Sequence, residues 1–168
     1  MDLKLKTISK SGMGEAIAKA ELYRYLNEPE EAESICRDVL AADPKHMLGL
    51  RTLGLAITDQ FTGGPSDRYG EVEAIFQRLA EPYERMYYLG LLCERRVKAQ
   101  LRSGRAPHTL LPLLEKAVQC FGDAEKIHPS ANDDAILRWN RCVRLLQSQP
   151  DFEAEEVASF EGLDGPPE

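Results

Sequence analysis

The sequence contains no long apolar run and no closely spaced pair of cysteines. No stretch approaches the ~18 apolar residues of a membrane-spanning helix, and Met1–Thr7 lacks the apolar core of a signal peptide. The four cysteines lie far apart among apolar neighbours, which is typical of buried thiols in a reducing compartment. These absences argue against a membrane protein and against a disulfide or zinc framework. We therefore expect a soluble, cytoplasmic protein without a metal or cofactor.

Aromatic residues and strand signals are also scarce. Aromatics make up 7% of the chain, alternation of apolar and polar residues never persists, and β-branched residues do not cluster. The hydrophobic share of 43% is ordinary for a globular protein, and 168 residues are enough to build a core without a covalent staple. The composition therefore indicates one folded domain without a β-sheet.

Negative charge is concentrated at one end of the chain. The net charge is −7, and the segment 151–168 contains seven acidic residues and no lysine or arginine. The rest of the chain has 21 acidic and 21 basic residues and is therefore neutral. A short segment of this composition buries too little apolar surface to fold alone. We predict a folded domain at residues 1–149 and an acidic, flexible tail at residues 150–168.

Proline- and glycine-rich breaks divide the domain into segments whose apolar residues recur at intervals of three and four, the pattern of amphipathic helices. Pro29 followed by two glutamates suits a helix start, as does Asn132 followed by two aspartates. Seven helices are predicted, at residues 12–26, 29–42, 45–60, 67–81, 83–103, 109–127 and 132–148.

Two of these segments share one spacing of small, large, small and proline residues. It occurs as Ala32-x3-Cys36-x2-Val39-x4-Pro44 and as Ala117-x3-Phe121-x2-Ala124-x4-Pro129. Among the other helices, Leu53-Gly54-x2-Ile57 is repeated as Leu89-Gly90-x2-Cys93. Over residues 12–148 the chain resembles the tetratricopeptide repeat (TPR) family, whose 34-residue unit has a small residue where paired helices approach closely.

This resemblance implies an all-α fold of antiparallel helix pairs that stack as a right-handed solenoid. About three pairs are expected, with the seventh helix covering the end of the stack. The apolar face of that last helix is predicted to contain Ala135, Ile136, Trp139, Cys142, Val143 and Leu146.

The resemblance also implies a concave groove lined by the first helix of each pair. The predicted groove residues are Arg51, Thr52, Leu55, Tyr87, Tyr88, Leu91, Arg95, Asn140 and Arg144. Tyrosine and arginine often dominate binding energy in protein interfaces. The alternative is that Tyr87 and Tyr88 complete the core and that the arginines only face solvent. These positions offer no set of lysines and asparagines of the kind that grips a C-terminal carboxylate in some TPR domains.

Signatures of catalysis are not found. The turn Thr62-Gly63-Gly64-Pro65 lacks the Lys-Ser/Thr of a phosphate-binding loop, and the three histidines lie near helix boundaries. We therefore expect no enzyme, and instead an adaptor or scaffold that binds a protein or peptide of unknown identity. The alternative is a permanent accessory subunit of a larger assembly. Basic residues in the fifth and seventh helices suggest nucleic-acid binding, but the neutral body and the acidic tail argue against it.

The acidic tail also contains spaced apolar residues, among them Phe160 and Leu163. One hypothesis is that these two residues dock into the arginine-rich groove of the same or a neighbouring molecule. The alternative is a tail that is simply solvated.

Overall fold

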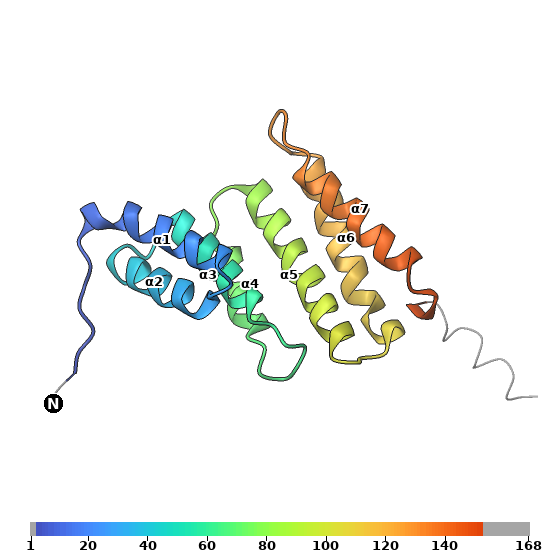
Figure 1. Ribbon diagram of the computed structural model, residues 1–168. Coiled ribbons are helices and arrows are strands. Elements are labelled where there is room, and N and C mark those ends of the chain that lie inside the picture. Colours follow the sequence, from blue (N-terminus) through green and yellow to red (C-terminus); the bar gives the residue numbers. More distant parts are fainter. Residues whose placement is uncertain (1–2, 153–168) are drawn as a thin grey trace, which may run out of the picture.

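The structure is a computed structural model that describes residues 3–152, and over this range the chain folds into seven α-helices (Figure 1). They are α1 (Met13–Tyr25), α2 (Pro29–Ala42), α3 (Met47–Asp59), α4 (Tyr69–Gln77), α5 (Pro82–Arg102), α6 (Leu111–Glu125) and α7 (Asp134–Gln147). Short 3-10 turns occur at Lys10–Gly12, Pro107–Leu110 and Pro150–Phe152. No strand is present among these residues, so the predicted all-α class and the seven predicted helices are confirmed.

Each helix packs against the next one in the chain. The odd-numbered helices also touch in sequence, α1 with α3, α3 with α5 and α5 with α7. This pattern is consistent with a helical repeat built from the pairs α1–α2, α3–α4 and α5–α6, with α7 packed on α6. Figure 1 shows α1 to α4 grouped on one side of α5, and α6 and α7 on the other.

The helix boundaries follow local chemistry. Pro29 and Pro82 occupy the first turns of α2 and α5, where a missing N–H is harmless. Asn132 Oδ1 accepts a hydrogen bond from the Asp134 backbone N–H at 2.9 Å, so α7 begins two residues later than predicted. The fourth helix is shorter than the predicted 67–81 because Asp67 is used by the preceding loop and Pro82 disfavours helical backbone just before it.

Two pairs of helices are closed by the same contact between a glycine and a phenylalanine. A Cβ added to Gly54 of α3 would overlap the Phe76 ring of α4, and one added to Gly90 of α5 would lie 2.9 Å from Phe121 Cε1 of α6. Both phenylalanines are fully buried. Glycine is therefore required at both positions because the paired helices approach closely there.

Two clusters of buried apolar residues form the core, and α5 contributes to both. Leu92 and Ala99 of α5 belong to the cluster formed by α1 to α4. Leu91 and Val97 belong to the cluster formed with α6 and α7. The long helix α5 is therefore buried on two sides.

The loop between α3 and α4 is held against α5. Gly63 has a φ of +88°, and a Cβ there would overlap the Ala99 carbonyl oxygen. The Asp67 carboxylate accepts hydrogen bonds from the backbone N–H groups of Thr62 and Gly63, both at 2.8 Å. The glycine-rich turn thus has a structural role.

The structure corrects two details at the end of the chain. Leu145, which was not predicted to be apolar-facing, is buried on α7, whereas Trp139 remains 38% exposed, because α7 packs on one side only. Phe152, which the sequence assigned to the tail, is 2% exposed and packs in the second core cluster. The rest of the predicted tail, with Phe160 and Leu163, lies outside the described residues.

A network around Glu33 fastens α2 to the loop before α4. The Glu33 carboxylate accepts two hydrogen bonds of 2.6 Å from the Arg68 guanidinium and one of 2.7 Å from the Gln60 amide. Arg37 donates two further bonds from one turn along α2. These bonds, that from Arg68 foremost, lower the pKa of Glu33 from 4.5 to about 2 despite the opposing effect of burial.

Replacing Gly54 by alanine tests the close approach of α3 and α4. We expect the free energy of unfolding to fall by about 1–3 kcal/mol, because the added methyl group forces the Phe76 ring to move. The measurement is urea denaturation followed by circular dichroism. Gly14→Ala in α1 is the control, since a Cβ there meets no atom within 4 Å and alanine favours a helix by up to about 1 kcal/mol. Equal losses in both variants would contradict the proposed contact.

Replacing Glu33 by glutamine tests the network through its pH dependence. Because the pKa of Glu33 is lowered in the folded state, its contribution to stability is present above pH 4.5 and is lost as the pH falls toward about 2. We expect Glu33→Gln to lower the free energy of unfolding by about 1–2 kcal/mol at neutral pH. Near pH 2 the variant and the unmodified protein should be equally stable. Denaturation curves across this pH range provide the measurement, with Glu115→Gln on the exposed face of α6 as the control.

Candidate functional site

The nine predicted groove residues do not all reach the surface. Thr52 and Leu91 are buried, at 1% and 4% exposure, and contribute to the core instead of a ligand surface. The other predicted positions remain at least partly accessible: Arg51, Leu55, Tyr87, Tyr88, Arg95, Asn140 and Arg144. Arg51 is paired with Glu84 on α5 at 3.0 Å.

The two tyrosines have a structural role. The ring of Tyr88 lies 5.3 Å from that of Phe76, and the ring of Tyr87 lies 5.8 Å from that of Phe121. The two tyrosine rings meet edge to face at 5.0 Å. Burial raises the pKa of Tyr88 above its ordinary value. Both rings therefore pack on the core phenylalanines and expose only part of their area.

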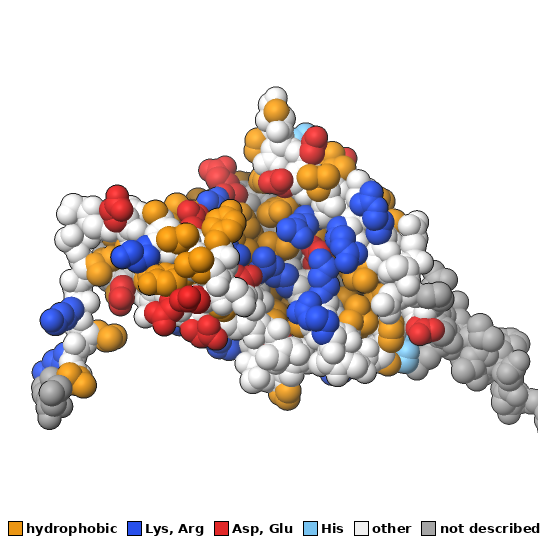
Figure 2. All heavy atoms as spheres, viewed as in Figure 1, with side chains coloured by type: hydrophobic (Ala, Val, Ile, Leu, Met, Phe, Trp, Pro, Cys, Tyr) orange, Lys and Arg blue, Asp and Glu red, His pale blue; other side chains and the backbone are white. Residues whose placement is uncertain are grey.

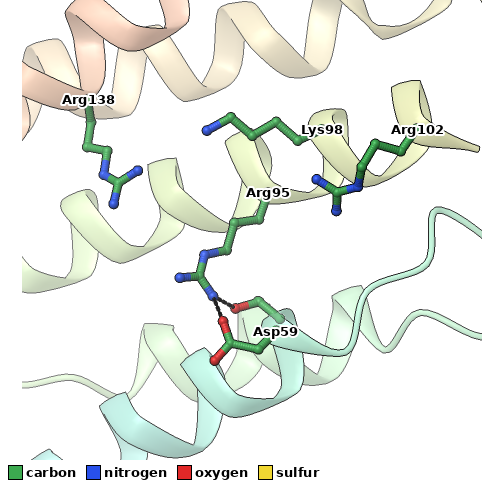
Figure 3. A pocket seen from close by; sticks show the side chains of 6 residues that line it. Asp59, Arg95, Lys98, Arg102 and Arg138 are labelled. Carbon is green, nitrogen blue, oxygen red and sulfur yellow. Dashed lines mark hydrogen bonds and ion pairs between the residues drawn. The ribbon is translucent and has the colours of Figure 1, made fainter. Parts of the chain in front are cut away.

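A strongly basic depression lies on the exposed side of α5, beside α3 and α7 (Figure 3). We call it the basic groove. It has a volume of about 300 Å³ and is lined by Thr58, Asp59, Arg95, Lys98, Arg102 and Arg138. Four of these side chains are cationic and one is anionic, so the groove attracts negative charge.

Arg95 is fixed in the wall of the groove. Its guanidinium is ion-paired with Asp59 and donates hydrogen bonds to Thr58 Oγ1 at 2.6 Å and to the Leu55 carbonyl at 3.3 Å. Burial lowers the pKa of Arg95, and the Asp59 carboxylate opposes that effect. Asp59 also pairs with Arg24 of α1 at 2.7 Å. This one carboxylate thus links α1, α3 and α5.

Lys98 and Arg138 are held by a fully buried carboxylate. Glu94 of α5 is 0% exposed, and its Oε1 atom pairs with Lys98 and lies 3.6 Å from an Arg138 nitrogen. Burial disfavours the charged form of Arg138, but its side-chain hydrogen bond with Tyr87 and the charge of Glu94 leave the pKa raised. Figure 3 shows Lys98 extending toward Arg138 across the groove.

Arg102 differs from the other cations. It lies at the last residue of α5, is exposed, and forms no hydrogen bond or ion pair within residues 3–152. Counting Glu94 behind the wall, the groove has four basic residues against two acidic ones. Its positive charge is therefore only partly neutralised within the described part of the chain.

Apolar side chains lie next to these cations. Leu22, Tyr25 and Leu26 at the end of α1 are 55%, 89% and 57% exposed. Arg24, between them in the sequence, connects this end of α1 to the groove through Asp59. Figure 2 shows lysine and arginine side chains gathered over α5 and α7, and apolar side chains over α1 beside them.

Among the described residues, the cysteines and the other potential metal ligands form no second centre. The four cysteines are unpaired, three of them are buried, and burial raises the pKa of Cys36 and Cys142 to about 12. Within residues 3–152 no group of three or more His, Cys, Asp or Glu side chains is placed to hold a metal ion. Over the same range, no helix has both the length and the apolarity of a membrane span.

Comparison of the chain with protein-family models, with curated proteins and with solved structures finds no match. The likeness to TPR proteins therefore stays an expectation based on the residues quoted above.

Sequence reasoning identified only one residue of the basic groove, Arg95. Lys98, Arg102 and Arg138 were noted as basic but were not assigned to a site. Residues 95, 98 and 102 are separated by three and four positions, so the sequence already indicated that they lie on one helix face. The position of Arg138 on the adjacent α7 depends on tertiary packing and has no local signal.

Replacing Glu94 by glutamine tests its role as the buried counter-ion. We expect a loss of about 1–3 kcal/mol in the free energy of unfolding, because Lys98 and Arg138 lose the carboxylate that compensates their charge. Arg102→Ala is the matched comparison and should change stability by less than about 0.5 kcal/mol, because Arg102 has no partner in the described structure. Urea denaturation of both variants provides the measurement, and equal losses would refute the assignment of these roles.

Proposed function

We propose that this protein is an interaction adaptor that binds an acidic segment of another protein in the basic groove. The observation that carries the proposal is the set of accessible cations Lys98, Arg102 and Arg138 around one open depression. Arg102 lacks a counter-ion in the described structure, and the other two share a single buried carboxylate. A carboxylate-rich ligand would complete this charge balance.

The apolar residues beside the groove suggest how such a ligand is anchored. Charge pairs at an exposed surface guide association but supply little affinity, whereas buried apolar and aromatic contacts supply more. Leu22, Tyr25 and Leu26 offer this contact on the α1 side. The best fit is therefore a peptide or helix with acidic residues on one face and apolar residues on the other.

The resemblance to TPR proteins supports the same conclusion by analogy. In that family the first helices of the pairs line the ligand-binding surface, and the basic groove lies on α3, α5 and α7. The proposed site is shifted from the predicted one toward the C-terminal half of α5, because Thr52 and Leu91 are buried and Arg51 is paired with Glu84. The unpaired cysteines support a reducing compartment such as the cytoplasm.

A permanent place in a larger assembly is the second candidate. It is favoured by the exposure of Leu22, Tyr25 and Leu26 at one end of the helix stack, because obligate interfaces are more apolar than transient ones. Gel filtration distinguishes the two candidates. A soluble monomer supports an adaptor, whereas self-association through α1 that is abolished by Tyr25→Glu supports a subunit.

The test of the adaptor proposal is affinity capture from native lysate with the full chain as bait. A double variant, Lys98→Ala with Arg102→Glu, removes positive charge from the groove, and Lys19→Ala with Lys45→Glu makes the same charge change at exposed sites elsewhere. We expect a partner that is retained by the unmodified chain and the control but lost by the groove variant. For the purified partner, the affinity should fall about tenfold at low salt and less at high salt, because surface charges are screened.

Recovery of the same proteins by all three baits would refute binding in the groove. Retardation of mixed oligonucleotides by the unmodified chain, and not by the groove variant, would instead assign the groove to nucleic acid. That result would replace a protein ligand with phosphate contacts.

A further inference from the structure

The basic groove opens close to the point where the described chain ends. Arg138 of α7 pairs with Glu94 of α5, and both helices run in the same direction, since each is antiparallel to α6 (Figure 1). Arg102 lies eight residues beyond Glu94, or about 12 Å along the helix axis, and is therefore level with the last turns of α7.

Phe152 is anchored at the same end of the molecule. Its side chain is buried, and the turn Pro150–Phe152 packs against Pro107–Leu110, the turn that follows α5. Phe152, the last described residue, therefore lies at the end of the molecule where α5 ends at Arg102.

The sequence after Phe152 matches the chemistry of the groove. Residues 153–168 include six acidic residues and no lysine or arginine. Val157, Phe160 and Leu163 recur among them at intervals of three. The segment therefore offers carboxylates for the cations of α5 and α7, and apolar side chains for the exposed end of α1.

We propose that residues 153–168 occupy the basic groove of their own molecule and compete there with the partner. This inference rests on the proposed function of the groove. The segment is long enough, because Phe160 is eight residues from Phe152 and an extended chain covers about 26 Å over that length. The distance from Arg102 to Arg95 along α5 is only about 10 Å.

The covalent link makes even a weak contact effective. A short tether gives an effective concentration in the millimolar range, so an intrinsic dissociation constant of about 0.1 mM leaves the groove occupied about nine-tenths of the time. An external ligand then binds about tenfold more weakly than it would to an empty groove.

The experiment uses full-length chains and a fluorescent peptide of residues 153–168 as the probe. In one variant, Glu155→Gln, Glu156→Gln, Phe160→Ser and Leu163→Ser remove two of the six acidic groups of the segment and two of its apolar side chains. We expect fluorescence anisotropy to show that this chain binds the probe about tenfold more tightly than the unmodified chain. Adding Arg102→Glu should abolish the gain, and adding Lys45→Glu, an exposed site in the α2–α3 turn, should preserve it.

Each other outcome has a defined meaning. Equal binding of the probe by the unmodified and tail-variant chains would overturn occupation of the groove by the tail. The adaptor proposal would survive that result if an unrelated acidic peptide still required Arg102, and it would fail if neither chain bound any acidic peptide. Dimers of the unmodified chain in sedimentation, lost in the tail variant, would place the tail in a second copy and overturn the intramolecular contact.

Discussion

Burial of α5 on two sides is the constraint on which the rest of the structure depends. Leu92 and Ala99 face one core and Leu91 and Val97 face the other, and the side of the helix that lines the groove is left as a stripe accessible to solvent. Residues at intervals of three and four share a helix face, and Arg95, Lys98 and Arg102 fill this stripe. Glu94 falls outside the stripe and is buried, so its charge must be paired from the groove side. The basic groove thus lies on a part of α5 that the two cores leave uncovered.

Local pattern predicted the helices well because their limits depend on neighbouring residues. Pro29 and Pro82 start helices whatever the rest of the fold does, and Gly54 and Gly90 recur at matching positions of a repeated pattern. Contacts between distant segments were not predictable in this way. Arg68 and Glu33 are 35 residues apart, and neither lies in a pattern that indicates the other. Burial of Phe152 likewise depends on a turn at Pro107–Leu110, whereas its acidic neighbours favoured a tail.

The site was harder to predict than the fold because a small rotation of a helix about its own axis moves a residue between core and surface. Transfer of groove positions from a resembling family assumes the same rotation of every helix about its axis. That assumption placed Thr52 and Leu91 on the surface, but the structure buries both. Arg95 is partly accessible, yet its pairing with Asp59 gives it a supporting role in the wall. In the sequence Arg102 is one of several arginines, and that it has no partner within residues 3–152 is a property of the folded chain.

Membership of α5 in both cores also bears on how the molecule opens. In a linear array of helix pairs, each contacting only its neighbours, one end can fray while the other stays folded. Here the loss of either core removes half of the support of α5, and with it the packing of the remaining half. Cooperative unfolding follows, and the backbone amides in the middle of α5 should exchange with solvent deuterium only when the whole domain opens. The helix that presents the groove should therefore exchange more slowly than the other helices, and it would offer a rigid surface to a bound segment.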